Sequence, residues 1–180
     1  YQLDGDIADS GQSSCITITA SDVVFDGQGN TLDGTNATDS VGVNITSSGP
    51  VSNVTVKDVT VRDWDTGVYT GATDTAVNDS TIGPINESAG IVLDGADGTV
   101  IADNTFEDGV DSGTRVVDSV FEGSASDDVT ILRNDIVNYG DRMVLNGNDY
   151  LVRGNTFTGT GTAIDLNMAP GSVVADNTYT

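Results

Sequence analysis

The sequence predicts an all-β protein, built as a solenoid of about seven short coils, and two observations support this. The phrase "VIADNTFEDG" (100–109) returns in shortened form as "LVRGNTFTG" (151–159) and "VVADNTYT" (173–180). No segment keeps a helical hydrophobic period, and the 22 glycines disfavour long helices. A repeat of roughly twenty to thirty residues, with β-branched strands and turns of Gly, Asp and Asn, is typical of β-solenoids.

Three apolar positions recur in each coil, and we expect a strand at each of them. The first is carried by the phrases "VGVNI" (41–45), "TGVYT" (66–70), "GIVL" (90–93), "RVV" (115–117), "RMVL" (142–145) and "AIDL" (163–166). The second is carried by Val56, Val77, Ile101, Ile131, Val152 and Val174, and the third by Leu32, Val61, Ile82, Phe106, Ile136, Phe157 and Tyr179. One coil cannot bury its own apolar face, so stacked coils about 4.8 Å apart would share a core in a rod roughly 30 Å long.

A polar column separates the second and third apolar positions. Its members are Asn30, Val59, Ser80, Asn104, Asn134, Asn155 and Asn177, at steps of 29, 21, 24, 30, 21 and 22 residues. Aligned Asn side chains in a turn can hydrogen-bond to one another and to the turn backbone. The sequence therefore predicts an internal Asn ladder, with Phe106, Phe157 and Tyr179 stacked inside the core.

The charge of the chain is extreme, with 28 acidic residues against 6 basic residues, a net charge of −22 and no histidine. The acids are 25 Asp and 3 Glu, and Lys57 is the single lysine. They are spread evenly among regular apolar positions, which disfavours a disordered acidic tail. Such a surface fits a protein that works in concentrated salt, where the Debye length falls to about 3 Å. The charge disfavours nucleic-acid partners, and no apolar run is long enough for direct membrane insertion.

Three stretches carry a resemblance to a known superfamily: "ITASDVVFDGQGNTLDG" (18–34), "VSNVTVKDVTVRDW" (51–64) and "GIVLDGADGTVIADNTFED" (90–108). They resemble the pectin-lyase-like right-handed parallel β-helices, which include pectate lyases, polygalacturonases and NosD-like or carbohydrate-binding repeat proteins. The opening 34 residues are most similar to secreted surface proteins of halophilic archaea. The resemblance implies a single right-handed parallel β-helix domain over residues 1–180. Both ends stop in mid-repeat, so we expect a truncated part of a longer chain.

Two classes of enzyme in this superfamily have recognisable catalytic residues. Polygalacturonase-like enzymes resemble one another in an Asp cluster with a nearby His, and this chain has no His. Pectate-lyase-like enzymes use an Arg or Lys base, with calcium held by carboxylates. Arg115 and Arg142, with Asp141 beside the latter, are the candidates for such a base. Among 25 Asp, however, an Asp beside an Arg also fits ordinary surface pairing.

The chain offers carboxylate, thiol and thioether side chains as potential metal ligands. Carboxylates on predicted turns make Asp94, Asp97, Asp127 and Asp128 candidate calcium ligands. The same segments are ordinary Asp-Gly turns, so we expect either no cofactor or calcium. Copper prefers soft or imidazole ligands, and Cys15, Met143 and Met168 without His are a poor set.

A glycan-binding groove is predicted from aromatic residues. Trp64 and Tyr139 both follow the third apolar position by three residues, so they should share one face, three coils or roughly 14 Å apart. Tyr69, Asp63, Asp65 and Asp141 would flank them. Aromatic rings stack on sugars and carboxylates accept sugar hydroxyls. The competing interpretation is that these aromatic rings cover apolar surface at the loops.

Two further sequence features bear on location. Cys15 is the only cysteine. The sequence around Cys15 favours a buried apolar residue. The resemblance to archaeal surface proteins instead implies a disulfide to a cysteine upstream of this segment. Five Asn-x-Ser/Thr sequons, at Asn36, Asn44, Asn53, Asn78 and Asn86, crowd into one region and suggest glycosylation.

These observations lead to one main expectation and two alternatives. We expect a non-catalytic structural or adhesive module at the cell surface or outside the cell, with glycans or neighbouring surface proteins as partners. The first alternative is a polysaccharide lyase that acts on acidic polysaccharides. The second is a subunit of a surface assembly that self-associates through its open coil ends.

Overall fold

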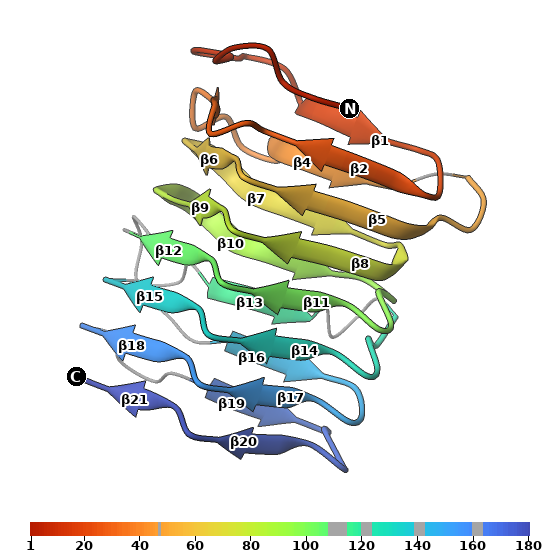
Figure 1. The fold of residues 1–180 in the computed structure, drawn as a ribbon, viewed down its shortest axis with the longest axis vertical. Helices are drawn as coiled ribbons and strands as arrows, with labels where there is room; N and C mark the ends of the chain where they lie inside the picture. Colours follow the sequence, from red (N-terminus) through yellow and green to blue (C-terminus); the bar gives the residue numbers. More distant parts are fainter. Residues whose placement is uncertain (47, 108–114, 120–123, 139–142, 160–163) are drawn as a thin grey trace.

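The computed structural model is an all-β solenoid of three parallel sheets (Figure 1). It describes residues 1–46, 48–107, 115–119, 124–138, 143–159 and 164–180, and no helix occurs within those ranges. Each sheet contains seven strands, one from each coil, so the fold class and the coil number that the repeat predicts are confirmed.

The strand bounds follow the three recurring apolar positions. The first sheet contains β1 (Ser14–Ile18), β4 (Val41–Ile45), β7 (Trp64–Thr70), β10 (Ile85–Leu93), β13 (Arg115–Ser119), β16 (Met143–Asn146) and β19 (Ile164–Asn167). The second contains β2 (Val23–Asp26), β5 (Ser52–Lys57), β8 (Thr73–Asn78), β11 (Val100–Ala102), β14 (Thr130–Leu132), β17 (Leu151–Arg153) and β20 (Val173–Ala175). The third contains β3 (Thr31–Asp33), β6 (Thr60–Arg62), β9 (Thr81–Ile82), β12 (Thr105–Glu107), β15 (Asp135–Val137), β18 (Thr156–Thr158) and β21 (Thr178–Tyr179).

The core runs along the inside of all three sheets. At the third apolar position the register stacks Leu32, Val61, Ile82, Phe106, Ile136, Phe157 and Tyr179. The rings of Phe157 and Tyr179 are stacked with centroids 5.1 Å apart. Ile136 of β15 lies between Phe106 and Phe157, so the predicted aromatic stack is a mixed apolar column.

Three glycines in the first sheet mark a place where the coils come too close for a side chain. A Cβ on Gly42 would lie 2.8 Å from the carbonyl oxygen of Gly67, and one on Gly67 would lie 2.5 Å from that of Gly90. A Cβ on Gly90 would lie 2.8 Å from the carbonyl oxygen of Val116. Contacts this short explain why the first apolar phrase contains Gly in three successive coils.

The predicted Asn ladder is present and continuous over the last four coils. The Oδ1 atom of Asn134 accepts the backbone N–H of Asn104 at 3.0 Å and its side-chain Nδ2–H at 3.1 Å. Asn155 accepts the same pair of bonds from Asn134, and Asn177 accepts them from Asn155. Each of these four Nδ2 groups also donates to a strand carbonyl of the preceding coil. The buried amides of Asn104, Asn134 and Asn155 are thereby satisfied.

The ladder continues toward the N-terminus with other residues. Ser80 donates its backbone N–H to Asn104 Oδ1 at 3.0 Å, and its own Oγ accepts the Val59 N–H at 3.3 Å. In the first coil, Asn30 donates to the carbonyls of Leu3 and Gly27. A short hydroxyl can therefore take the place of Asn, while Val59 contributes only its backbone.

Two columns of left-handed backbone flank the second sheet and account for many of the aspartates. One residue at or just before the start of each of its strands has φ between 53° and 77°: Asp22, Asn53, Asp74, Gly98, Asp128, Asp149 and Gly171. The residues that precede the ladder have φ between 50° and 74°: Gly29, Asp58, Asp79, Asp103, Arg133, Gly154 and Asp176. Apart from Gly, Asp and Asn adopt this conformation most readily. Eight of the 25 Asp residues thus occupy these left-handed positions.

Asn134→Ala tests the ladder. The substitution leaves the buried N–H and Nδ2–H of Asn104 without their acceptor and removes the side-chain donor to Asn155 Oδ1. We expect the free energy of unfolding to fall by about 2–4 kcal/mol, because buried polar groups lose their partners. Urea unfolding in molar KCl measures it, with the exposed-face substitution Thr156→Ala as the control. A loss below about 0.5 kcal/mol, the range of ordinary surface changes, would contradict this role.

Candidate functional site

The outer face of the first sheet brings together polar and aromatic side chains suited to binding. Its central outward row is Thr17, Asn44, Tyr69, Val92, Asp118, Val144 and Asp165, held in register across all seven strands. Tyr69 lies between the buried residues Val68 and Thr70, so its ring is directed away from the core. Away from the two ends of the solenoid, Tyr69 is the one aromatic side chain of the described chain that is partly open to solvent.

Tyr69 is held by a carboxylate from the next coil. Its hydroxyl donates to Asp94 Oδ2 at 2.6 Å, and Asp94 Oδ1 accepts the backbone N–H of Ser124 at 2.9 Å. Burial, together with the hydrogen bond and the charge of Asp94, raises the pKa of Tyr69 to about 12. The phenol therefore stays neutral, and Asp94 links three successive coils.

Arg115 lies on the same face and is paired with Asp118. Its Nη1 is 2.6 Å from Asp118 Oδ2, while its buried Nε has no partner. Asp118 and Tyr69 are two strands apart in one row, or roughly 10 Å at parallel-strand spacing. The face therefore offers an aromatic ring, an arginine and two carboxylates.

Every other basic residue in the described part of the chain is also paired with an aspartate. Lys57 lies 3.0 Å from Asp26, and Arg62 lies 2.9 Å from Asp33. Arg133 pairs with Asp103 through two hydrogen bonds, and Arg153 with Asp176. These pairs lower the pKa of Asp26 and of Asp103. Arg142 and Asp141, two of the candidates for lyase chemistry, lie outside the described residues.

Trp64 does not belong to an exposed groove, and that part of the groove prediction is wrong. Its side chain is 0% exposed, and its indole N–H donates to the Leu32 carbonyl at 3.0 Å. The two glycines Gly34 and Gly42 leave the space for its ring. Trp64 starts β7 at a corner of the solenoid, where its side chain points inward. Tyr139 lies outside the described residues.

Asp63 and Asp65 lie at the same corner but have different partners. Asp65 is buried, and its Oδ2 accepts the backbone N–H of Asp39 at 3.0 Å. Asp63 has φ 58° and lies close to Asp33. Burial, followed by the hydrogen bond and charge of Asp33, raises the pKa of Asp63. Trp64, the aromatic residue between them in the sequence, is buried, so within the described residues these carboxylates do not flank an exposed ring.

The four candidate calcium ligands bond to neighbouring turns. Asp97 Oδ1 accepts the Asp127 N–H at 2.9 Å, and Asp127 Oδ1 accepts the Asn148 N–H at 2.7 Å. Asp128 occupies the left-handed turn column, and Asp94 bonds Tyr69 and Ser124. Within the described ranges, no three acidic, Cys or His side chains gather as a metal site requires.

The modification candidates fall into distinct environments. Asn36 and Asn53 are exposed, at φ 55° and 57°, whereas Asn44 and Asn78 are half-buried with a buried Oδ1 that lacks a partner. Asn86 is half-buried in β10.

Cys15 is a free thiol that is half-buried and packs against the core, and burial raises its pKa. Its pairing with a cysteine outside the segment stays a prediction.

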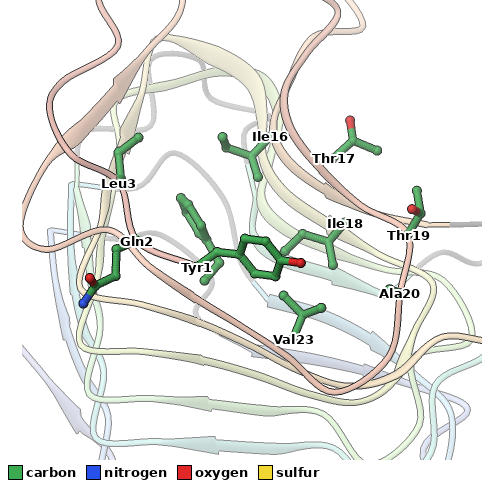
Figure 2. Close-up of a pocket in the computed structure, with 10 residues that line it drawn as sticks. Tyr1, Gln2, Leu3, Ile16, Thr17, Ile18, Thr19, Ala20 and Val23 are labelled. Carbon is green, nitrogen blue, oxygen red and sulfur yellow. The ribbon is translucent and has the colours of Figure 1, made fainter.

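A pocket of about 430 Å³ opens beside the first coil, where sequence reasoning did not expect one (Figure 2). It is lined by Tyr1, Gln2, Leu3, Ile16, Thr17, Ile18, Thr19, Ala20, Val23 and Phe25. The N-terminal segment pairs with the second and third sheets through Gln2–Asp26 and Ile7–Leu32. The lining side chains are apolar, hydroxyl or amide groups, and none is an acid, a base or a thiol. Among side chains that transfer protons in enzymes, the lining offers the Tyr1 phenol alone.

Comparison with known proteins gives one family and no individual relative. The family model described as "Right handed beta helix region" matches residues 7–179. No curated protein and no solved structure matches this chain. No helix among the described residues is long and apolar enough to span a membrane.

Asp63→Asn tests the electrostatics of the corner. The pKa of Asp63 is raised in the fold, so its contribution to stability is present below the unfolded pKa and is lost as pH rises through the folded pKa. The neutral variant should therefore have a higher urea midpoint than the parent at pH 7. The two midpoints should converge below about pH 4.

Asp22→Asn is the matched control for this comparison, because it also removes one charge at a left-handed position. Asp22 Oδ1 accepts a hydrogen bond from Asn53 at 2.7 Å, so an amide rather than a carboxylate is its partner. Equal midpoints for parent and Asp63→Asn at pH 7, or a lower midpoint for the variant, would show that burial and Asp33 do not destabilise the ionised carboxylate.

Proposed function

Because the chain belongs to the right-handed β-helix family, we propose that it is a non-catalytic cell-surface or extracellular module of a halophilic archaeon that binds glycans. The observation that carries the proposal is the outer face of the first sheet, where the Tyr69–Asp94 hydrogen bond and the Arg115–Asp118 ion pair lie on neighbouring coils. The scaffold beneath that face is rigid, because its strands pair in register from coil to coil.

The chemistry of these four residues suits sugar recognition. A neutral phenol presents an aromatic ring that can pack on the apolar face of a sugar. The carboxylates of Asp94 and Asp118 accept hydroxyl hydrogens, and the Arg115 guanidinium donates to ring or hydroxyl oxygens. These groups are spread over successive coils, which suits an extended polymer, whereas small compact ligands bind in concave pockets.

The net charge and the accessible sequons support the proposed location at a cell surface in concentrated salt. A net charge of −22 repels acidic glycans in dilute buffer, whereas molar salt screens that repulsion. The exposed sequon residues Asn36 and Asn53 fit glycosylation of a surface protein better than the half-buried ones.

A polysaccharide lyase is the alternative that the same face allows. Arg115 would have to serve as the base, but its guanidinium is held in an ion pair with Asp118, with Nη1 2.6 Å from Oδ2. The binding proposal therefore fits the observed contacts better, and one experiment distinguishes the two.

The test is retention on immobilised neutral and acidic polysaccharides in molar KCl, with unsaturated product measured in the same samples. Tyr69→Ala and Asp94→Asn should each weaken retention about tenfold or more, because an anchoring contact is lost. Thr60→Ala, on the outer face of the third sheet, is the matched control and should bind like the parent.

Three results would contradict the proposal. Unsaturated product that disappears in Arg115→Ala would establish a lyase. Retention that Tyr69→Ala leaves unchanged would place binding on another surface. No retention on any polymer would leave the module with a scaffold role only.

A further inference from the structure

Asp65 is the one charged residue that the fold buries within the described part of the chain. It is 8% exposed, whereas every other acidic side chain that the structure describes is half-buried or exposed. Burial of a carboxylate is costly unless hydrogen bonds and an opposite charge compensate for the lost water. We therefore expect both carboxylate oxygens of Asp65 to have partners.

Only one of the two oxygens has a partner in the described chain. Oδ2 accepts the backbone N–H of Asp39 at 3.0 Å. Oδ1 is fully buried, and no hydrogen-bond partner for it occurs among the described residues. Asp65 thus has one carboxylate oxygen that is screened from solvent and not satisfied by the protein.

No basic side chain of the described ranges compensates for the charge of Asp65 either. Each of the five described basic residues pairs with a different aspartate: Lys57 with Asp26, Arg62 with Asp33, Arg115 with Asp118, Arg133 with Asp103 and Arg153 with Asp176. A positive charge beside Oδ1 would therefore have to come from outside the chain.

The preceding coil covers Asp65 from one side. A single residue, Asp63, separates β6 from β7, whereas residues 34–40 separate β3 from β4. The longer segment is attached to the short corner through Ser40, which is 2% exposed. Ser40 Oγ accepts the Asp65 N–H at 3.2 Å, and the Ser40 carbonyl accepts the Thr66 N–H at 2.9 Å. A hydroxyl oxygen therefore lies next to Asp65.

The following coil has a bulge opposite Asp65. Trp64 pairs with Ile85 and Thr66 pairs with Ala89, so Asp65 alone stands opposite residues 86–88 of β10. The extra residues of such a bulge have no ladder partner on the neighbouring strand. Backbone carbonyl groups that are not used by a ladder can bind a cation in place of its water shell.

We propose that Asp65 Oδ1 binds one monovalent alkali cation, K⁺ or Na⁺, and that neutral oxygens of Ser40 and of residues 86–88 complete its shell. A single carboxylate balances one positive charge. Calcium takes six to eight oxygen ligands, commonly with several carboxylates, and no three acidic side chains gather within the described ranges. The ion ties three successive coils together at the corner. The site does not depend on glycan binding, because Asp65 is buried.

Urea unfolding in about 2 M KCl, NaCl or choline chloride tests the proposal at equal ionic strength. Choline is too large for a buried site. A site that is half-filled at about 0.1 M K⁺ raises the folding equilibrium constant of the parent about twentyfold in 2 M KCl. Asp65→Asn should lose this gain and, in choline chloride, should be at least as stable as the parent, because the buried charge is gone.

Asp58→Asn is the matched control, because Asp58 is an exposed aspartate of the same coil with φ 50°. It removes one charge and should keep the full gain in KCl. General effects of the salts on stability appear in all three proteins and cancel in the comparison. Equal ratios between KCl and choline chloride for the parent and Asp65→Asn would overturn the proposal and leave the carboxylate to a proton or a water molecule.

Anomalous scattering from crystals soaked in RbCl gives a direct second readout. Rb⁺ should produce a peak beside Asp65 Oδ1 in the parent and none there in Asp65→Asn. A parent crystal without that peak would overturn the proposal. Stabilisation by submillimolar Ca²⁺ that Asp65→Asn abolishes would also overturn it, because the site would then be divalent.

Discussion

The structure depends on the hydrogen bonds that pass from one coil to the next through the two-residue turn before the third sheet. The Oδ1 atoms of Asn134, Asn155 and Asn177 each accept two N–H groups of the preceding coil, one from the backbone and one from a side chain. A shift of register by one residue would leave both donors buried without a partner. The ladder therefore aligns the second and third sheets over the last four coils, and coil length varies in the other turns.

The aspartates stabilise the turns of the solenoid and also give the chain its negative charge. Eight aspartates adopt left-handed backbone beside the second sheet, and others accept turn N–H groups of the next coil, as Asp97 and Asp127 do. Glutamate is a poor substitute at such positions, because only a short polar side chain bonds to the nearby backbone. The bias of 25 Asp to 3 Glu follows in part from the solenoid, and the large negative charge accompanies it.

The repeat was sufficient to predict the strands, the number of coils and the ladder, because periodic residues have one structural role in every coil. Trp64 shows where this reasoning fails. Its position in the alignment did not reveal that the chain turns a corner there, nor that Gly34 and Gly42 leave room for its ring. Tyr69 and Asp94 were assigned to different sites, because the register that brings them together runs between coils of unequal length.

Native-state hydrogen exchange of the turn amides tests the central claim most directly. Four turn amides donate to side-chain oxygens of the next coil: those of Ser80, Asn104, Asn134 and Asn155. They should exchange as slowly as the central strand amides of Val77 and Ile131, through global unfolding. Fast exchange of these four amides, while the strand amides stay protected, would show that the ladder does not hold the coils together.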